Sequence, residues 1–253
     1  MAENTGNISG FQDVITRTIK YMEIGIYDYR KTHESLLDMT RRTLNAIEKN
    51  GTIDADKWVL VYAGPNASGK STIAAKLNQE LMLPFVNPDM LAKLCYSHIE
   101  DEETRYRVHA MPHAELLRKN FAQSGSSFSF ETVFSDPRKL NEIDILRRCG
   151  YRIGTVWLCT ENPAINEARA LIREAEGGHH VPPDKIITRY YKSMNNLNGL
   201  LQLSDKAVVI DNSCPMPIVL IEKSQGEYHS SNEGFNSQWI HTYIPLLNEP
   251  AQF

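Results

Sequence analysis

Residues 64 to 71 have the types and spacing of a phosphate-binding loop. They read Gly-Pro-Asn-Ala-Ser-Gly-Lys-Ser, which matches the pattern G-x-x-x-x-G-K-S. The glycines let the backbone wrap around a di- or triphosphate, and N–H groups at the start of the following helix point at the phosphate oxygens. Lys70 is expected to reach the β- and γ-phosphates, and Ser71 to ligate Mg²⁺. The predicted nucleotide-binding residues are Gly64, Pro65, Asn66, Ala67, Ser68, Gly69, Lys70, Ser71 and Thr72.

The flanking residues favour this interpretation over an ordinary glycine-rich turn. The apolar, β-prone run 58–63 precedes the loop, and residues 72–81 have helical spacing after it. A strand, a loop and a helix in this order are the context that separates a nucleotide site from a chance match.

The bulk composition bounds the class of protein. The chain has 253 residues, 42% hydrophobic and 23% charged, with a net charge of −4, as expected for a globular protein with a substantial core. The negative charge disfavours a nucleic-acid partner that needs a broad basic face. No signal peptide and no apolar run near 18 residues is visible, so we expect no membrane segment and a cytoplasmic setting. A secreted effector that acts in a host cytosol would look the same.

Strand and helix patterns alternate along the centre of the chain. Apolar or alternating runs at 58–63, 84–87, 127–132, 152–159 and 206–211 predict strands, and helical patterns separate them. This order predicts an α/β fold, a P-loop kinase-like three-layer sandwich with a mostly parallel central sheet. The helix that follows Asp89 is expected to break near Pro112.

We divide the chain into three parts on these patterns. Residues 1–55 form a helical N-terminal extension, and residues 56–214 form the kinase-like core with a lid around 169–190. Residues 215–253 form a tail with a hairpin around Gln225 and Gly226, in which Trp239, Ile240 and Tyr243 supply packing.

Polar side chains at the ends of the predicted strands are candidates for chemistry, because ligands of open parallel sheets bind at the carboxyl ends of the strands. Asp89 could orient and deprotonate an acceptor hydroxyl or help to hold Mg²⁺, or it could be a helix N-cap. Glu131 could bind substrate hydroxyls or a Mg²⁺-bound water, or it could be a solvated loop acid. For residues 211–213 we favour a turn that hydrogen-bonds its own backbone.

Arginines on two helices flank a hinge-like segment. Arg169 and Arg173 are four residues apart and share a helix face, and Arg189 lies on the next helix. Residues 177–183, Gly-Gly-His-His-Val-Pro-Pro, separate the two arginine-bearing helices, and such a hinge is what a closing lid requires. His179 in this segment is expected to have a structural or substrate-contact role. The strand 154–159 carries no acidic residue, which favours a small-molecule kinase over a motor or transporter ATPase.

Together these motifs resemble the zeta-toxin family of P-loop kinases. The resemblance runs from about Trp58 to Ser213, and the first 55 residues lie outside it. Besides the phosphate loop it rests on residues 86–89 (Val-Asn-Pro-Asp), 128–132 (Phe-Ser-Phe-Glu-Thr), 150–152 (Gly-Tyr-Arg), 177–182, Arg189-Tyr190, Ser193, Asn196-Leu197 and Asp211-Asn212-Ser213.

The resemblance implies an ATP-dependent kinase that acts on a hydroxyl, which in the best-known members belongs to a UDP-N-acetyl amino sugar. It implies that Lys70 and Ser71 serve ATP and Mg²⁺ and that Asp89 is the general base. Glu131 and Thr132 would contact the acceptor, while Arg173 and Arg189 would clamp the phosphates. Asn87 and His179 complete the expected substrate contacts.

Two features leave the acceptor and the partners open. Residues 107–114 depart from an Ala-Gly-Arg stretch common in the zeta-like branch, and some relatives act on other acceptors, including a dinucleotide. The alternatives are a regulatory or interaction module with weak ATPase activity and a kinase of a nucleotide or polynucleotide. The family also suggests a helical antitoxin, and residues 11–48 are either such an inhibitor in the same chain or helices that pad the core.

Overall fold

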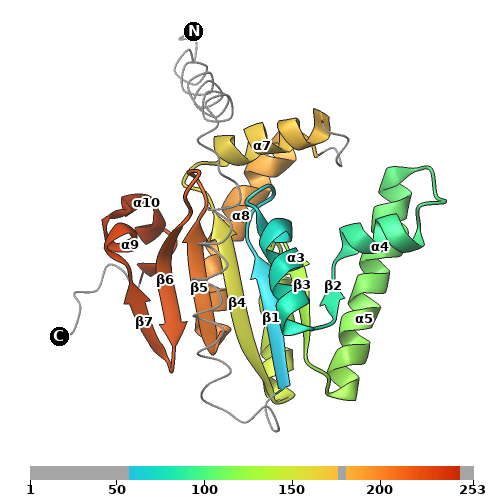
Figure 1. The fold of residues 1–253 in the computed structure, drawn as a ribbon, viewed down its shortest axis with the longest axis horizontal. Helices are drawn as coiled ribbons and strands as arrows, with labels where there is room; N and C mark the ends of the chain where they lie inside the picture. The colour runs from blue at the N-terminus through green and yellow to red at the C-terminus, as the bar shows by residue number, and fades with distance from the viewer. Residues whose placement is uncertain (1–56, 176–180, 246–253) are drawn as a thin grey trace.

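A seven-stranded sheet runs through the molecule (Figure 1), in a computed structural model that describes residues 57–175 and 181–245. The strand order is β2-β3-β1-β4-β5-β6-β7. The first five strands in this order are parallel, and β6 and β7 are added antiparallel at one edge. The strands are β1 (Lys57–Ala63), β2 (Phe85–Val86), β3 (Phe128–Thr132), β4 (Tyr151–Cys159), β5 (Lys206–Asp211), β6 (Ile218–Ser224) and β7 (Glu227–Ser230).

The helices cover both faces of this sheet and so form the three layers that the sequence predicts. They are α3 (Lys70–Leu81), α4 (Pro88–Cys95), the π-helix η1 (Thr104–Ala110), α5 (Met111–Ser124), α6 (Arg138–Arg148), α7 (Pro163–Ala175), α8 (Pro183–Leu203), α9 (Asn232–Asn236) and α10 (Gln238–His241). Successive residues of β1 alternate between the faces, because side chains of a strand point to opposite sides. Val59 and Val61 pack with residues of α5, α6 and α8, whereas Leu60 and Tyr62 pack with α3.

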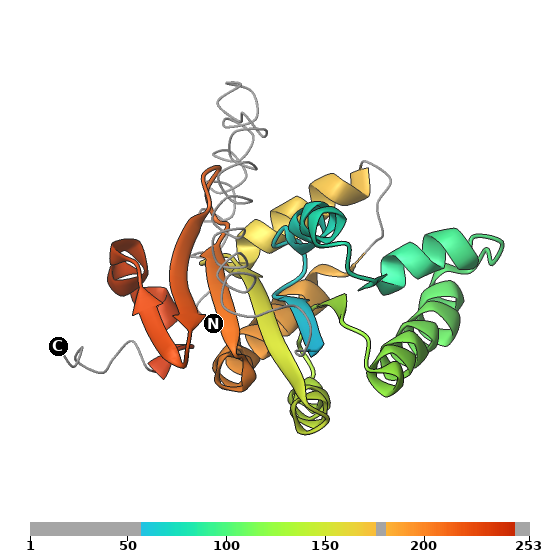
Figure 2. The same ribbon diagram turned by 60° about the horizontal axis from the view of Figure 1, so that its bottom comes forward.

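The segment from α4 to α5 extends from the β2 edge of the sheet, opposite the edge formed by β7, α9 and α10 (Figures 1 and 2). We call α4, η1 and α5 the arm. The predicted break at Pro112 is wrong, because η1 continues directly into α5. Proline is tolerated in the first turn of a helix, and the junction between π- and α-helix places Pro112 there.

The C-terminal tail extends the sheet instead of only packing against it. The predicted hairpin is confirmed, with Gln225 and Gly226 between β6 and β7 at φ of 54° and 85°. Positive φ at both loop residues is the geometry of a tight type I′ turn. Leu220 of β6 is fully buried in the main core, and Ile240 joins the same cluster with Trp239 and Tyr243 packed against it, as predicted.

Three predicted features lie outside the described residues. These are the N-terminal extension 1–55, the Gly-Gly hinge at 177–178, and His179. Within the described ranges, no helix combines the length and the apolar character needed to cross a membrane.

Candidate active site

The phosphate loop connects β1 to α3 and needs glycine at two positions. Gly64 has φ of 135°, and a Cβ atom there would lie 1.8 Å from the carbonyl oxygen of Leu158. Gly69 has φ of 98°, and its Cβ would lie 2.6 Å from Nδ2 of Asn212. Both the left-handed backbone and the close approach of neighbours therefore exclude a side chain at these positions.

Two asparagines from other elements hold the loop in shape. Asn166, in the first part of α7 and fully buried, donates from Nδ2 to the carbonyl of Asn66 over 2.6 Å, and its Oδ1 accepts from the Thr160 hydroxyl. Asn212, directly after β5, donates from Nδ2 to the carbonyl of Ser68 over 2.9 Å. The sequence analysis missed both of these anchors, because no local pattern shows which backbone carbonyl a distant asparagine will reach.

Asp211 and Ser213 form the turn that the sequence favoured. The backbone N–H of Ser213 donates to Oδ1 of Asp211 over 2.8 Å, and the Ser213 hydroxyl also donates to this oxygen. Burial raises the pKa of Asp211, and these hydrogen bonds oppose the rise. The turn places Asn212, which lies between the two residues, against the phosphate loop.

Lys70 lies at the centre of the site and is only 6% exposed. Its Nζ donates to the carbonyl of Pro65 over 2.6 Å. Burial lowers the pKa of Lys70, while the nearby charges of Glu131 and Asp89 raise this pKa and that of Arg173 lowers it. The tertiary structure thus brings four predicted site residues together from the phosphate loop, β3, α4 and α7.

Glu131 joins the phosphate loop to the segment that follows β2. Its Oε1 accepts from the Ser71 hydroxyl over 2.9 Å, and its Oε2 accepts from Nδ2 of Asn87 over 2.8 Å. Burial raises the pKa of Glu131, whereas Lys70 and both hydrogen bonds favour the charged form. The solvated-acid alternative for Glu131 is therefore wrong.

The N-cap of α4 is Asn87, not Asp89. Oδ1 of Asn87 accepts from the backbone N–H groups of Asp89, over 2.8 Å, and of Met90, over 3.2 Å. The capping alternative for Asp89 is therefore wrong, and its exposed carboxylate lies in the first helical turn, where the helix dipole favours a negative charge.

The arrangement fits a Mg²⁺–nucleotide complex. Among the described residues, the buried Ser68 hydroxyl has no hydrogen-bond partner, and it lies within the phosphate loop where a phosphate oxygen can accept from it. The Ser71 hydroxyl and a Glu131 oxygen are 2.9 Å apart. Mg²⁺ in nucleotide sites is held by one or two carboxylates or hydroxyls together with phosphates and water, which is the donor set present here.

The three predicted arginines point to different parts of the site. Arg173 is exposed on α7, and its charge acts on Lys70. Arg189 of α8 acts on Tyr106, on which Asp89 and Glu131 also act. Arg169 instead donates from Nη2 to the carbonyl of Ser213 over 3.4 Å. Although the two arginines share a helix face, Arg169 therefore contacts the turn after β5, whereas the charge of Arg173 acts on Lys70.

Tyr106 is a site residue that the sequence analysis missed. It lies in η1, and burial raises its pKa to about 12, with the charge of Asp89 as the next cause. Single π-helical turns occur frequently at functional sites. The hydroxyl of Tyr106 is therefore protonated at neutral pH, and the charges of Asp89 and Glu131 add to the rise of its pKa.

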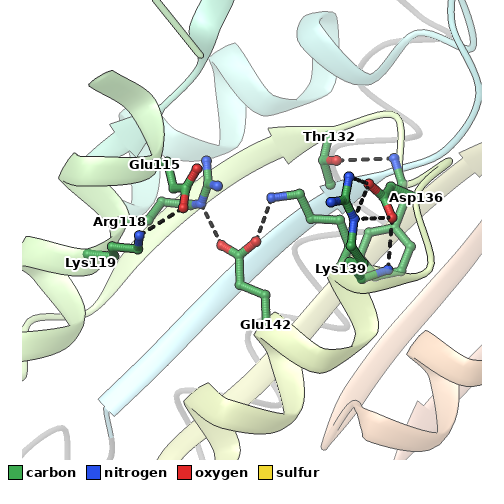
Figure 3. Close-up of polar contacts among 9 residues, drawn as sticks. Glu115, Arg118, Lys119, Thr132, Asp136, Lys139 and Glu142 are labelled. Atoms are coloured by element: carbon green, nitrogen blue, oxygen red, sulfur yellow. Dashed lines mark hydrogen bonds and ion pairs between the residues drawn. The ribbon is translucent and has the colours of Figure 1, made fainter. Parts of the chain in front are cut away.

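Thr132 begins the loop between β3 and α6. Its Oγ1 accepts from the backbone N–H of Phe134 over 3.1 Å (Figure 3). Phe134 is buried and has φ of 57°, a strained value for a non-glycine residue. Two residues of α8 hold the loop: the Ser193 hydroxyl donates to the carbonyl of Val133 over 2.6 Å, and Nδ2 of Asn196 donates to that of Phe134 over 2.9 Å.

A partly buried ion pair ties the arm to the core (Figure 3). Arg118 of α5 is 9% exposed and donates from Nε to Glu142 of α6 over 2.7 Å. Lys139 contacts the other oxygen of Glu142 over 2.5 Å. The Arg118 guanidinium also lies 5.2 Å from the ring centre of Phe130 in β3. These contacts fix the arm, which carries Asp89 and Tyr106.

Comparisons with known proteins agree with this geometry. The zeta toxin family model matches residues 41–215, which is more than half of the chain. The match begins inside the segment 1–55, which the sequence motifs placed outside the resemblance. A search of curated proteins found no match.

Two solved structures share the fold. One is the AvrRxo1-ORF1:AvrRxo1-ORF2 complex, solved with sulphate ions and also with ATP, at a TM-score of 0.59 and 17% identity over 84% of this chain and 72% of that chain. The other comes from the PezAT chromosomal toxin-antitoxin system of Streptococcus pneumoniae, at a TM-score of 0.55 and 15% identity over 88% of this chain and 90% of that chain. At these identities the likeness establishes the P-loop kinase-like fold.

Proposed function

Because the chain belongs to the zeta toxin family, we propose that it transfers the γ-phosphoryl group of ATP to a hydroxyl of a nucleotide sugar of the UDP-N-acetyl amino sugar type. Membership makes the chain a phosphotransferase of the kinase type. The observation that carries the proposal is the set of hydrogen bonds that joins Ser71, Glu131 and the start of α4 beside the buried Lys70. A lysine for the donor phosphates and a carboxylate for an acceptor hydroxyl are what such a transfer requires.

The donor half of the site lies around the phosphate loop. Backbone N–H groups of the loop bind the phosphates, and Lys70 moves from the carbonyl of Pro65 to the β- and γ-phosphates when ATP is bound. Ser71 and Glu131 would hold Mg²⁺, which would supply positive charge to offset that of the phosphates. Burial of Lys70 strengthens its interaction with the phosphates, since the local dielectric is low.

The acceptor half lies between the arm and α8. Asp89 accepts the proton of the attacking hydroxyl, and Tyr106, whose pKa the charge of Asp89 helps to raise, lies on the same arm. The hydroxyl hydrogen of Thr132 remains available to the acceptor, because its oxygen accepts from Phe134. Arg173 and Arg189 neutralise charge on the transferring group when the lid at 169–190 closes.

The test is incubation with γ-labelled ATP and pools of nucleotide sugars, nucleosides and dinucleotides. We expect label in a nucleotide sugar with wild-type protein and none with Lys70→Ala, because the lysine holds the transferred group. Label in a dinucleotide or nucleoside would change the acceptor class. Binding of ATP without transfer to any member of the pools would favour a regulatory module, and full transfer by Lys70→Ala would remove the proposal.

For partners we propose an inhibitory antitoxin. The PezAT neighbour is a toxin-antitoxin system, which supports such a partner for this chain. Residues 11–48 supply the alternative of an inhibitor within the chain. Copurification of the tagged full-length chain from a strain that carries its genomic neighbours distinguishes a separate antitoxin from an inhibitor in cis.

A further inference from the structure

Asn87 occupies the junction between the two halves of the site. It is 5% exposed and lies between β2 and α4. Its Oδ1 accepts from two backbone N–H groups at the start of α4, and its Nδ2 donates to Glu131. The amide is therefore engaged within the protein at both ends, which argues against the substrate contact that the sequence analysis assigned to Asn87.

The contacts form a continuous path from the phosphate loop to α4. The Ser71 hydroxyl donates to Oε1 of Glu131 over 2.9 Å, and Nδ2 of Asn87 donates to Oε2 over 2.8 Å. The same asparagine accepts from the backbone N–H of Asp89 over 2.8 Å. Each contact uses a different atom, so none competes with another and all three can form together.

The chemistry of the path requires an amide at position 87. A serine or aspartate caps a helix about as well as an asparagine, so capping alone would accept any of the three. Only asparagine also offers an N–H donor at this length to a carboxylate. Nδ2 of Asn87 holds Oε2 of Glu131. Oε1 of Glu131 then faces the Ser71 hydroxyl, where the two side chains would hold Mg²⁺.

We propose that Asn87 is a positioning residue that orients the Glu131 carboxylate toward Ser71 and couples the phosphate loop to the Asp89-bearing start of α4. The inference rests on the proposed function, since it assigns Glu131 to the Mg²⁺–ATP side of that site. Residues that orient a metal-binding group from behind it typically account for a 10- to 100-fold change in metal affinity or activity, about the size expected here.

The experiment measures the affinity for mant-ATP, a fluorescent ATP analogue, with Mg²⁺ and with EDTA. Asn87→Ser keeps a cap on α4 but removes the donor to Glu131. We expect its affinity in EDTA to equal that of the wild type and the gain from Mg²⁺ to fall roughly tenfold. Thermal stability should stay near that of the wild type, because the cap is kept.

A double-mutant cycle tests whether the effect runs through Glu131. In a Glu131→Ala background, Asn87→Ser should have no further effect on the gain from Mg²⁺, because the group that Asn87 orients is gone. An undiminished effect in that background would overturn the inference. So would a gain from Mg²⁺ in Asn87→Ser equal to that of the wild type.

A matched control removes a helix cap far from the site. Ser231 caps α9 by accepting from the N–H of Gly234 over 2.9 Å, at the opposite edge of the sheet. Ser231→Ala should change neither the affinity in EDTA nor the gain from Mg²⁺, and a similar loss of that gain there would overturn the inference as a general effect of altering a helix start. If the wild-type protein binds no mant-ATP, the proposed function is overturned. If all variants bind mant-ATP with the same gain from Mg²⁺, only the inference about Asn87 is overturned.

Discussion

Asp89 and Glu131 are two carboxylates of one site in different surroundings. Asp89 is exposed in the first turn of α4, whereas Glu131 is held between Ser71 and Asn87. Burial raises the pKa of Glu131, and the charge of Lys70 opposes this rise. A group that reacts with an incoming hydroxyl must be accessible, and a group that holds a metal must be oriented. The two environments fit the different roles proposed for these residues.

We expect Asp89→Asn to keep ATP binding and to lose transfer. The substitution preserves shape but removes the proton acceptor, and loss of a general base typically costs roughly 100- to 10,000-fold in rate. The measurement is single-turnover transfer of label from γ-labelled ATP to the acceptor pool, beside mant-ATP affinity. Full transfer activity in this variant would remove Asp89 from the proposed role.

Glu131 gives a prediction about stability and pH. Its folded pKa is raised above the ordinary value of 4.5, so the folded state binds the proton more tightly than the unfolded state. The contribution of Glu131 to stability is therefore present below the ordinary pKa and is lost as pH rises through the folded pKa. As pH rises above the ordinary pKa of 4.5, the melting temperature of Glu131→Gln should rise relative to that of the wild type without ligand.

The control for this prediction is the melting temperature of Glu115→Gln over the same pH range. Glu115 is an exposed carboxylate that pairs with Lys119. Its pKa is lowered, chiefly by the hydrogen bond from Lys119. Its contribution is thus present above its ordinary pKa and is lost as pH falls, which is the opposite sign. A Glu131→Gln profile parallel to that of the wild type would show that burial does not control this carboxylate.

The arm and α8 are the elements that carry the residues proposed for the acceptor side of the site. The arm carries Asp89 and Tyr106, and α8 carries Arg189 together with Ser193 and Asn196, which hold the loop after Glu131. These three residues of α8 are spaced so that they share one helix face. A movement of α8 would therefore move Arg189 and the Thr132 loop together.

The ion pair between Arg118 and Glu142 gives a prediction at this scale. We expect Arg118→Ala to destabilise the protein by about 2 kcal/mol, less than the loss of a fully isolated buried pair, because Lys139 still contacts Glu142. Urea unfolding measures the change. Among the described residues, the hydrogen bonds of this ion pair do not include Asn87, Glu131 or the phosphate loop. The affinity for mant-ATP should therefore change little.

The matched variant is Arg138→Ala. Arg138 pairs with Asp136 on the surface, with a side-chain exposure of 86%. Exposed pairs in high dielectric contribute little, so no measurable change in stability is expected. Equal effects of the two substitutions would show that the Arg118 pair does not anchor the arm.

At the scale of the molecule, the parallel sheet gathers the site at one edge. The carboxyl ends of β1, β3 and β5 deliver the phosphate loop, Glu131 and the turn with Asn212. The antiparallel strands β6 and β7 extend the sheet away from this cluster and complete the core. The proposed site thus lies at the carboxyl ends of the parallel strands and on the helices that follow them, and the C-terminal tail serves packing.

A prediction for the whole protein concerns growth. Expression of the wild type without an antitoxin should slow bacterial growth and accumulate a phosphorylated metabolite, because the enzyme would consume a nucleotide sugar. Lys70→Ala, expressed to the same level, should do neither. An untargeted metabolite profile of the two strains measures the difference, and identical profiles would contradict the toxin-like role.

The sequence by itself determined the phosphate loop, the α/β alternation and most strand positions. These features are local: glycine conformations, apolar periodicity and turn residues each act over a few neighbouring positions. The C-terminal hairpin at Gln225 and Gly226 was predictable for the same reason. The continuity of the helix through Pro112 was not predictable, because the tolerance for proline there depends on the π-helix before it.

Only the tertiary structure decided which residues meet. It placed Asn87 rather than Asp89 at the helix cap, joined Arg169 to the carbonyl of Ser213, and brought Tyr106 within the electrostatic influence of the two carboxylates. It also supplied Asn166 and Asn212 as anchors of the phosphate loop across 100 and 144 residues of sequence. Hydrogen bonds of side chains across such separations depend on packing of whole elements, and no local pattern of the chain encodes their partners.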